Sequence, residues 1–136
     1  MKVFIISSAS FYDRIPPIKE YLEKKGFELV MPNTYENPTL EKEILEQGHE
    51  AHVELEKKLF KMSEDKIKSV DAVLCLNYEK RGIKNYIGRA TFIEIYEAFK
   101  NNKKIYLYHD IPEGMLYDEL SGFNSIVINE NLDLIG

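Results

Sequence analysis

Short apolar and β-branched runs alternate along the chain with longer segments of helical spacing, and this alternation constrains the fold most. Five runs have the composition of strands, at residues 3–7, 27–31, 70–77, 103–108 and 125–129. Helical segments separate them, beginning near Pro16, Leu40, Gly88 and Pro112. Because crossovers between parallel strands are right-handed, this order predicts a doubly wound α/β fold. We expect a five-stranded parallel sheet in flavodoxin-like (Rossmann-like) order, covered by helices on both faces as a three-layer sandwich.

The length of 136 residues predicts one domain, residues 1–136. The only cysteine, Cys75, excludes a disulfide framework and lies in an apolar run, where we expect it to be a small buried hydrophobe. Asp13 and Arg14 follow the first apolar run too soon for a signal peptide, and no apolar stretch has membrane length. We therefore expect a cytoplasmic protein that does not associate with membranes.

The charge pattern favours a small-molecule ligand. A net charge of -5 argues against general binding to nucleic acid, although local groups can still hold a small phosphorylated molecule. The segment 40–70 alternates Glu and Lys, which is typical of a solvated helix face, and Gly48 is positioned to split it into two helices. Its length leaves surface that can pack against a second subunit, so a homo-oligomer is expected.

The loop after the run 70–77 is the expected binding region, because ligands of open α/β sheets lie beyond the carboxyl ends of the strands. A helix that begins near Gly88 directs free N–H groups and a partial positive charge there, which favours an anion such as phosphate. Glu94, about one turn into that helix, can face the same ligand; alternatively, it only complements the helix dipole. The candidate substrate-binding residues are Ser7, Ser8, Asn77, Tyr86, Gly88, Arg89 and Thr91.

Several familiar motifs are missing. There is no Gly-x-Gly-x-x-Gly after the first strand and no Gly-x-x-x-x-Gly-Lys-Ser/Thr, so neither a dinucleotide nor a triphosphate site is predicted. His49, His52 and Glu56 have a spacing that can place metal ligands on one helix face, but two solvent-facing histidines on a charged helix are the favoured interpretation. We predict no metal and no cofactor.

The segment from Asp71 to Leu74, followed by a loop and residues 88–98, resembles the nucleoside 2-deoxyribosyltransferase superfamily, which includes the deoxynucleotide N-hydrolases. Residues 2–8 are similar to that family's first strand and small-residue loop, and the spacing from Asp71 to Glu94 is close to the family's. The resemblance covers most of the chain. It implies the same doubly wound fold and a small-molecule nucleoside or nucleotide as the partner.

The resemblance also implies that Glu94 is a nucleophile, which attacks the anomeric carbon of a (deoxy)nucleoside or nucleoside 5′-monophosphate as the base leaves. A carboxylate suits this reaction because cleavage of an N-glycosidic bond builds positive charge on the sugar. Water as acceptor makes the protein a hydrolase and a second base makes it a transferase; both stay open. Asp71 is the second catalytic candidate, with a purely structural role as its alternative. Arg89 can pair with a phosphate, which favours a nucleotide over a nucleoside.

Two departures from the family pattern matter. Ser63 stands where the family often has an acidic residue, with Glu64 and Asp65 next to it, so the general acid is not identified. Tyr96 stands where a glycine commonly follows the Glu-Ile pair, and this larger side chain can change the substrate or close the site. A non-catalytic nucleotide-binding or sensing module on the same fold is the alternative function. Family members often complete one site with a neighbouring subunit, which again favours a homodimer.

Overall fold

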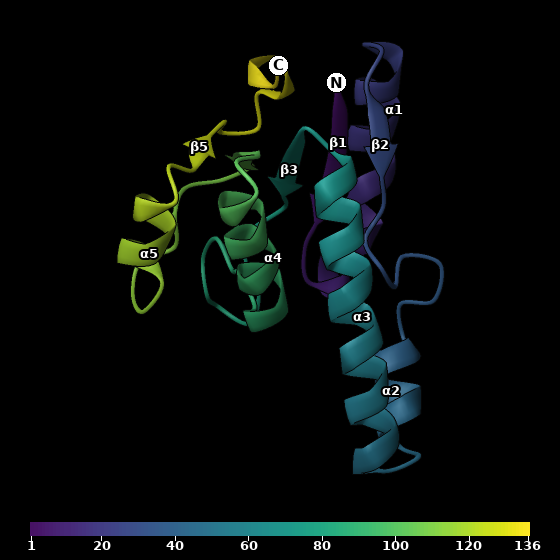
Figure 1. Ribbon diagram of the computed structural model, residues 1–136. Helices are drawn as coiled ribbons and strands as arrows, with labels where there is room; N and C mark the ends of the chain where they lie inside the picture. The colour runs from purple at the N-terminus through teal and green to yellow at the C-terminus, as the bar shows by residue number, and fades with distance from the viewer.

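A five-stranded sheet forms the centre of the structure, a computed structural model that describes residues 1–136 (Figure 1). The strands are β1 (Lys2–Ile6), β2 (Glu28–Val30), β3 (Ala72–Cys75), β4 (Lys104–Leu107) and β5 (Ile126–Val127). They lie in the order β2-β1-β3-β4-β5, and each neighbouring pair is parallel. This order and pairing confirm the predicted flavodoxin-like sheet.

The helices are α1 (Ile15–Lys24), α2 (Leu40–Leu45), α3 (His49–Ser69), α4 (Arg89–Lys100) and α5 (Tyr117–Gly122), with 3-10 turns η1 (Ala9–Arg14) and η2 (Leu132–Leu134). Helices α1 to α4 begin near the expected breaks, whereas α5 begins at Tyr117, later than the expected start near Pro112. Pro16 and Pro17 lie in the first turn of α1, where a missing N–H costs nothing. Gly48 separates α2 from α3 at φ +114, a conformation that other residues rarely adopt.

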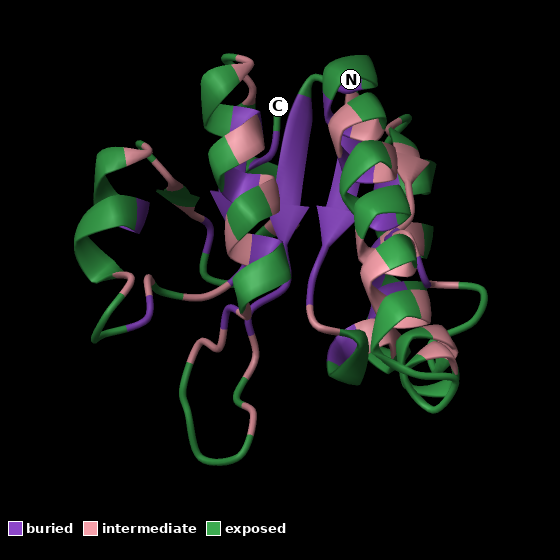
Figure 2. Cartoon of the chain, turned by 60° about the horizontal axis from the view of Figure 1, so that its bottom comes forward, coloured by how far each residue is buried: buried purple, intermediate pink, exposed green.

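Side chains of the central strands alternate between two apolar layers. Val3 and Ile5 of β1 pack with α1, together with residues of η2 and the C-terminus. Phe4 and Ile6 point to the other face, where Ile67 of α3 contributes to the core with residues of α4 and α5. Figure 2 shows the buried strands between helices whose outward surfaces are exposed. Helices therefore cover both faces, as the three-layer prediction requires.

The observed strands are shorter than the apolar runs that predicted them. The run 70–77 contributes only Ala72–Cys75 to β3, because these four residues are the ones that pair with both β1 and β4. The segment after β1 is also more regular than expected. Ser8 caps the 3-10 turn η1 by accepting a hydrogen bond from the Ser10 N–H at 3.4 Å.

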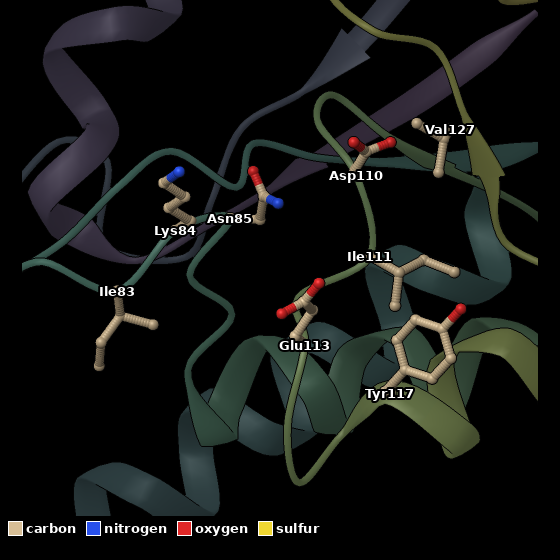
Figure 3. Close-up of a pocket in the computed structure, with 8 residues that line it drawn as sticks. All are labelled: Ile83, Lys84, Asn85, Asp110, Ile111, Glu113, Tyr117 and Val127. Carbon is tan, nitrogen blue, oxygen red and sulfur yellow. The ribbon is translucent and has the colours of Figure 1, made fainter.

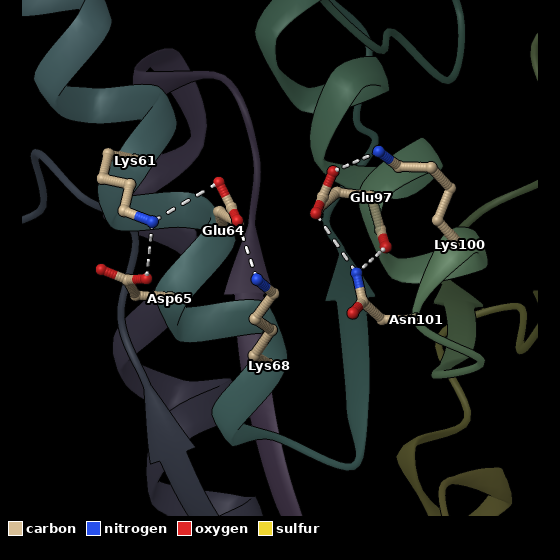
Figure 4. Close-up of polar contacts among 7 residues, drawn as sticks. All are labelled: Lys61, Glu64, Asp65, Lys68, Glu97, Lys100 and Asn101. Carbon is tan, nitrogen blue, oxygen red and sulfur yellow. Dashed lines mark hydrogen bonds and ion pairs between the residues drawn. The ribbon is translucent and has the colours of Figure 1, made fainter.

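The outer faces of α3 and α4 are solvated, as the charge pattern predicts (Figure 4). On α3, Glu64 pairs with Lys68 at 2.8 Å, and Lys61 lies 3.5 Å from Asp65. Such exposed pairs contribute little to stability, usually less than about 1 kcal/mol each. None of the helices combines the length and apolar character that a bilayer-spanning segment needs.

Candidate functional site

A cleft of about 670 Å³ lies at the carboxyl ends of β1, β2 and β3. Three loops and three helices contribute to its wall, because parallel strands deliver their following segments to the same edge of the sheet. The loop after β1 brings Ser7 to Ser10, the loop after β2 brings Pro32 to Thr34, and the start of α4 brings Gly88 to Thr91. Glu94 lines the same cleft from the second turn of α4.

The carboxylate of Glu94 is held by a short chain of hydrogen bonds. Ser63 of α3 donates its hydroxyl hydrogen to Oε2 of Glu94 at 2.8 Å. Asn33, from the loop after β2, donates Nδ2–H to the Ser63 hydroxyl at 2.7 Å and to the Leu59 carbonyl at 3.0 Å. Glu94 also borders a groove of about 350 Å³ between α3 and α4, so its carboxylate lies between the cleft and that groove.

Burial of the carboxyl group raises the pKa of Glu94 to about 7, against the opposing effects of the Ser63 hydrogen bond and the Lys66 charge. Glu94 keeps part of its surface open, although protein atoms shield most of its carboxyl group from solvent. Lys66 donates to the Met31 carbonyl at 2.9 Å, and its own pKa is lowered by burial. Near neutral pH, Glu94 therefore exists in both protonation states, which is typical of groups that take part in reactions.

Six predicted binding residues lie together in the cleft: Ser7, Ser8, Tyr86, Gly88, Arg89 and Thr91. The backbone of Gly88 lies close to Tyr86: a Cβ at position 88 would lie 3.3 Å from the Tyr86 hydroxyl, a tight contact. Lys80, which the sequence did not single out, donates to the Ser8 hydroxyl at 3.0 Å and lies 4.9 Å from the centre of the Tyr86 ring. The cleft thus contains two cations, Lys80 and Arg89, beside hydroxyl groups and the N-terminus of α4.

Asp71 and Asn77 do not join this group. Asp71 directly precedes β3 and so lies at the amino-terminal ends of the strands, away from the cleft at their carboxyl ends. Its Oδ2 accepts the Lys2 N–H at 2.8 Å. This bond supports the structural role of Asp71 and argues against a catalytic one. Asn77 is fully buried; its amide donates to the carbonyls of His109 and Asp110 and accepts the His109 N–H. It joins the loops after β3 and β4 and has no hydrogen-bonding capacity pointed at the cleft.

Tyr96 corrects another expectation. Its side chain is 45% exposed, and its ring packs 5.7 Å from that of Phe123, outside the residues that line the cleft. It therefore does not narrow or close the cleft, because helix periodicity turns it to the side of α4 opposite Ser63. The Tyr96 ring packs instead against Phe123, which directly follows α5.

A second pocket of about 680 Å³ lies at the same edge of the sheet, between the loop after β3 and the segments after β4 (Figure 3). Its carboxylates, Asp110 and Glu113, come from one loop, and Lys84 and Asn85 face them from the other. Asn85, in the loop after β3, lines this pocket and not the cleft with Glu94. The two pockets are thus separated by the loop 78–88.

Three titratable residues of the cleft were missed or misjudged from the sequence: Glu41, His52 and Glu56. His52 lies 3.4 Å from Glu56, so it is not simply solvent-facing as expected. Partial burial of the Glu41 carboxyl group raises the pKa of Glu41, and the neighbouring Glu56 carboxyl group raises it further. Their helices meet only in the folded chain, so sequence spacing could not group them. No three His, Cys, Asp or Glu side chains are arranged to bind a metal ion.

Comparisons with known proteins agree with this architecture. No family model and no curated protein sequence matches the chain. Among solved structures, the chain is similar to the CMP N-glycosidase BcmB of Clostridium botulinum, with a TM-score of 0.57 and 21% sequence identity. The superposition covers 94% of this chain and 88% of that one. At this identity the similarity shows the fold alone: both chains have a doubly wound α/β architecture.

Proposed function

We propose that the protein cleaves or transfers the N-glycosidic bond of a nucleoside 5′-monophosphate, with Glu94 as nucleophile. The observation that carries the proposal is the Glu94 carboxylate, which lines the cleft at the carboxyl edge of the sheet and accepts a hydrogen bond from Ser63. The sequence resemblance and the fold shared with a CMP N-glycosidase support the same reaction class.

The proposed reaction has two steps. Ionised Glu94 attacks the anomeric carbon and forms a glycosyl ester, while the C–N bond breaks and its electron pair leaves with the base. Water then attacks the ester and releases the sugar phosphate, or a second base does so and gives a new nucleotide. The leaving base needs a proton, and Glu41 is our candidate source, because burial and the neighbouring Glu56 carboxylate raise its pKa and so favour its protonated form.

Release of free base tests this proposal. Purified protein is incubated with ribo- and deoxyribonucleosides and their 5′-monophosphates, and free base and sugar product are separated by chromatography. We expect base release from at least one monophosphate, faster than from the matching nucleoside. Turnover without added acceptor base identifies a hydrolase, and turnover only with a second base identifies a transferase. If no substrate releases base under either condition, the proposal is wrong.

We propose Lys80, which lies in the cleft beside Ser8, as a phosphate ligand in addition to Arg89. Replacement of Lys80 gives a separate prediction. Lys80→Met should weaken the apparent affinity for a nucleoside monophosphate by about 10- to 100-fold, because hydrogen bonds to charged groups contribute about 1.5–3 kcal/mol. The matching nucleoside should be affected less than about threefold, since it lacks the phosphate. Lys84→Met is the control, because Lys84 lines the second pocket. Equal losses for nucleotide and nucleoside would remove Lys80 from the phosphate site.

A non-catalytic nucleotide-binding module is the second candidate. Ser63 favours it, because this hydroxyl stands where the resembled family often has an acid. Under this function, a nucleoside monophosphate raises the thermal unfolding midpoint without any base release, since a ligand that binds only the native state stabilises it. Thermal-shift titration and the base assay on the same samples separate the two candidates.

We also propose a homo-oligomer. The exposed apolar side chains beside the groove between α3 and α4 offer a surface for a second copy: Phe60 is 41% and Ile93 is 46% exposed. Because Glu94 borders that groove, a second copy there lies next to the site.

A further inference from the structure

We propose that Ser63 is a positioning residue for Glu94: its hydroxyl, which is itself held by Asn33, donates to Oε2 and leaves Oε1 as the atom that bonds the substrate. This inference rests on the proposed function, because it assigns roles to the two oxygens of the proposed nucleophile. The residues come from three different elements, the loop after β2, α3 and α4, so the fold and not local sequence brings them together.

The direction of the hydrogen bonds follows from the chemistry of each group. The Leu59 carbonyl can only accept, so the amide group of Asn33 must present Nδ2 to it at 3.0 Å. The same Nδ2 lies 2.7 Å from the Ser63 hydroxyl, which therefore accepts from Asn33. Ser63 has one hydrogen to donate, and the Glu94 carboxylate at 2.8 Å is its partner. The chain of donors thus runs in one direction, from Asn33 to Ser63 to Oε2.

Oε1 remains available. No protein group donates a hydrogen bond to it, and it is not a buried atom without a partner, so it keeps access to solvent. When one carboxylate oxygen accepts a hydrogen bond from the protein and the other accepts none, the second oxygen is the preferred attacking atom. Fixing that atom before the substrate binds is the kind of orientation that lowers a reaction barrier.

The Ser63 hydroxyl has no role in apolar packing that would explain its burial. Ser63 is 7% exposed and stands between Leu59 and Ile67, four residues away on each side, in a stripe of α3 that otherwise buries apolar side chains. A buried hydroxyl in such a stripe needs a hydrogen-bond partner to offset its desolvation, and Glu94 provides it. Asn33 also leaves its Oδ1 buried without a protein partner, an arrangement that does not favour stability. Both features fit residues retained for the site.

Other charged groups also face Glu94 and enter its titration. Lys66 of α3 partly offsets the rise in the Glu94 pKa that burial causes. Burial also raises the pKa values of Tyr12 in η1 and Cys75 in β3, and the Glu94 charge adds to both increases. The remaining charged residues of the cleft are Glu41, His52, Glu56, Lys80 and Arg89. Those of the neighbouring groove are Lys57, Lys61, Glu64 and Glu97. Ser63 differs from all of them because it acts through a direct hydrogen bond to a defined oxygen.

Ser63→Ala tests the proposal through both the pH profile and kcat. Loss of the hydrogen bond should move the acid limb of the kcat/KM profile upward by roughly one pH unit, because that bond favours the ionised carboxylate. At high pH, where Glu94 is ionised in both proteins, kcat should still fall about 10-fold with little change in KM, since orientation and not binding is lost. Ser63→Thr, which keeps a hydroxyl, should recover both quantities. Asn33→Ala should move both in the same direction as Ser63→Ala.

The control is Ser69→Ala, on the same helix, where the hydroxyl donates only to the Lys66 carbonyl at 2.7 Å and is exposed. A carbon-13 NMR titration of the Glu94 side chain, assigned with Glu94→Gln, measures the pKa shift without any turnover. If base release is intact but Ser63→Ala changes neither the titration nor kcat, or if threonine does not restore them, Ser63 has no positioning role. If the wild-type protein releases no base at all, the proposed function fails and this inference fails with it.

Discussion

Glu94→Gln will lower the rate of base release from a nucleoside monophosphate by at least about 1,000-fold, because it removes the proposed nucleophile. The amide is nearly the same size as the carboxylate and can still accept the Ser63 hydrogen bond, so the local structure should be retained. It cannot form a stable ester with the anomeric carbon, nor can it place a negative charge beside the cationic transition state. The measurement is kcat/KM of the wild-type and variant proteins at the pH optimum.

Glu97→Gln is the matched control for this loss. Glu97 lies on the same helix, where it pairs with Lys100 at 3.1 Å and accepts a hydrogen bond from Asn101 (Figure 4). It does not line the cleft, so the substitution should change kcat/KM by less than about threefold. Comparable losses in the two variants, or substantial activity in Glu94→Gln, would mean that the reaction uses another group.

The same substitution should make the protein more stable at pH 8. The pKa of Glu94 is raised from its ordinary 4.5 to about 7 by burial, so the unfolded chain ionises this group first as pH increases. Wild-type stability therefore falls between about pH 4.5 and 7, and the loss persists above it. At pH 8 the penalty reaches up to about 3 kcal/mol, which glutamine removes. At pH 5 the gain should be less than about 1 kcal/mol, because folded Glu94 is still protonated.

Urea unfolding of both proteins at the two pH values measures this difference in free energy. Glu97→Gln should show no gain at pH 8, because it only weakens a partly exposed ion pair with Lys100. A gain for Glu94→Gln that is the same at pH 5 and pH 8 would contradict the raised pKa. We expect Glu94→Gln to be more stable but less active than the wild type, because the buried Glu94 charge serves the reaction and destabilises the fold.

The sheet could be predicted from the sequence because buried parallel strands are short apolar runs with recognisable interruptions. The run 70–77 predicted β3, and Gly48 predicted the break between α2 and α3, since its positive φ is incompatible with helix continuation. Strand ends were less accurate. They depend on which residues find a pairing partner on both sides, and apolar character alone does not report this.

The site was only partly predictable, because the sequence position of a polar side chain does not reveal which group it bonds in the folded chain. Asp71 and Asn77 have side chains of the type that binds ligands and flank β3. In the structure, both side chains form hydrogen bonds to backbone groups of other segments. Ser63 was noticed only as a missing acid, although a polar residue in the apolar stripe of α3 was a usable signal. Glu41 and His52 enter the cleft through packing of α2 against α3, which no local pattern encodes.

Detection of the covalent sugar on Glu94 tests the central claim most directly. A nucleoside monophosphate with fluorine at C2′ slows both steps, since fluorine destabilises the cationic transition states, and mass spectrometry of protease fragments then locates the adduct. We predict one sugar phosphate on the peptide that contains Glu94, formed as base is released and absent from Glu94→Gln. Base release with the sugar phosphate attached to another residue would contradict the account.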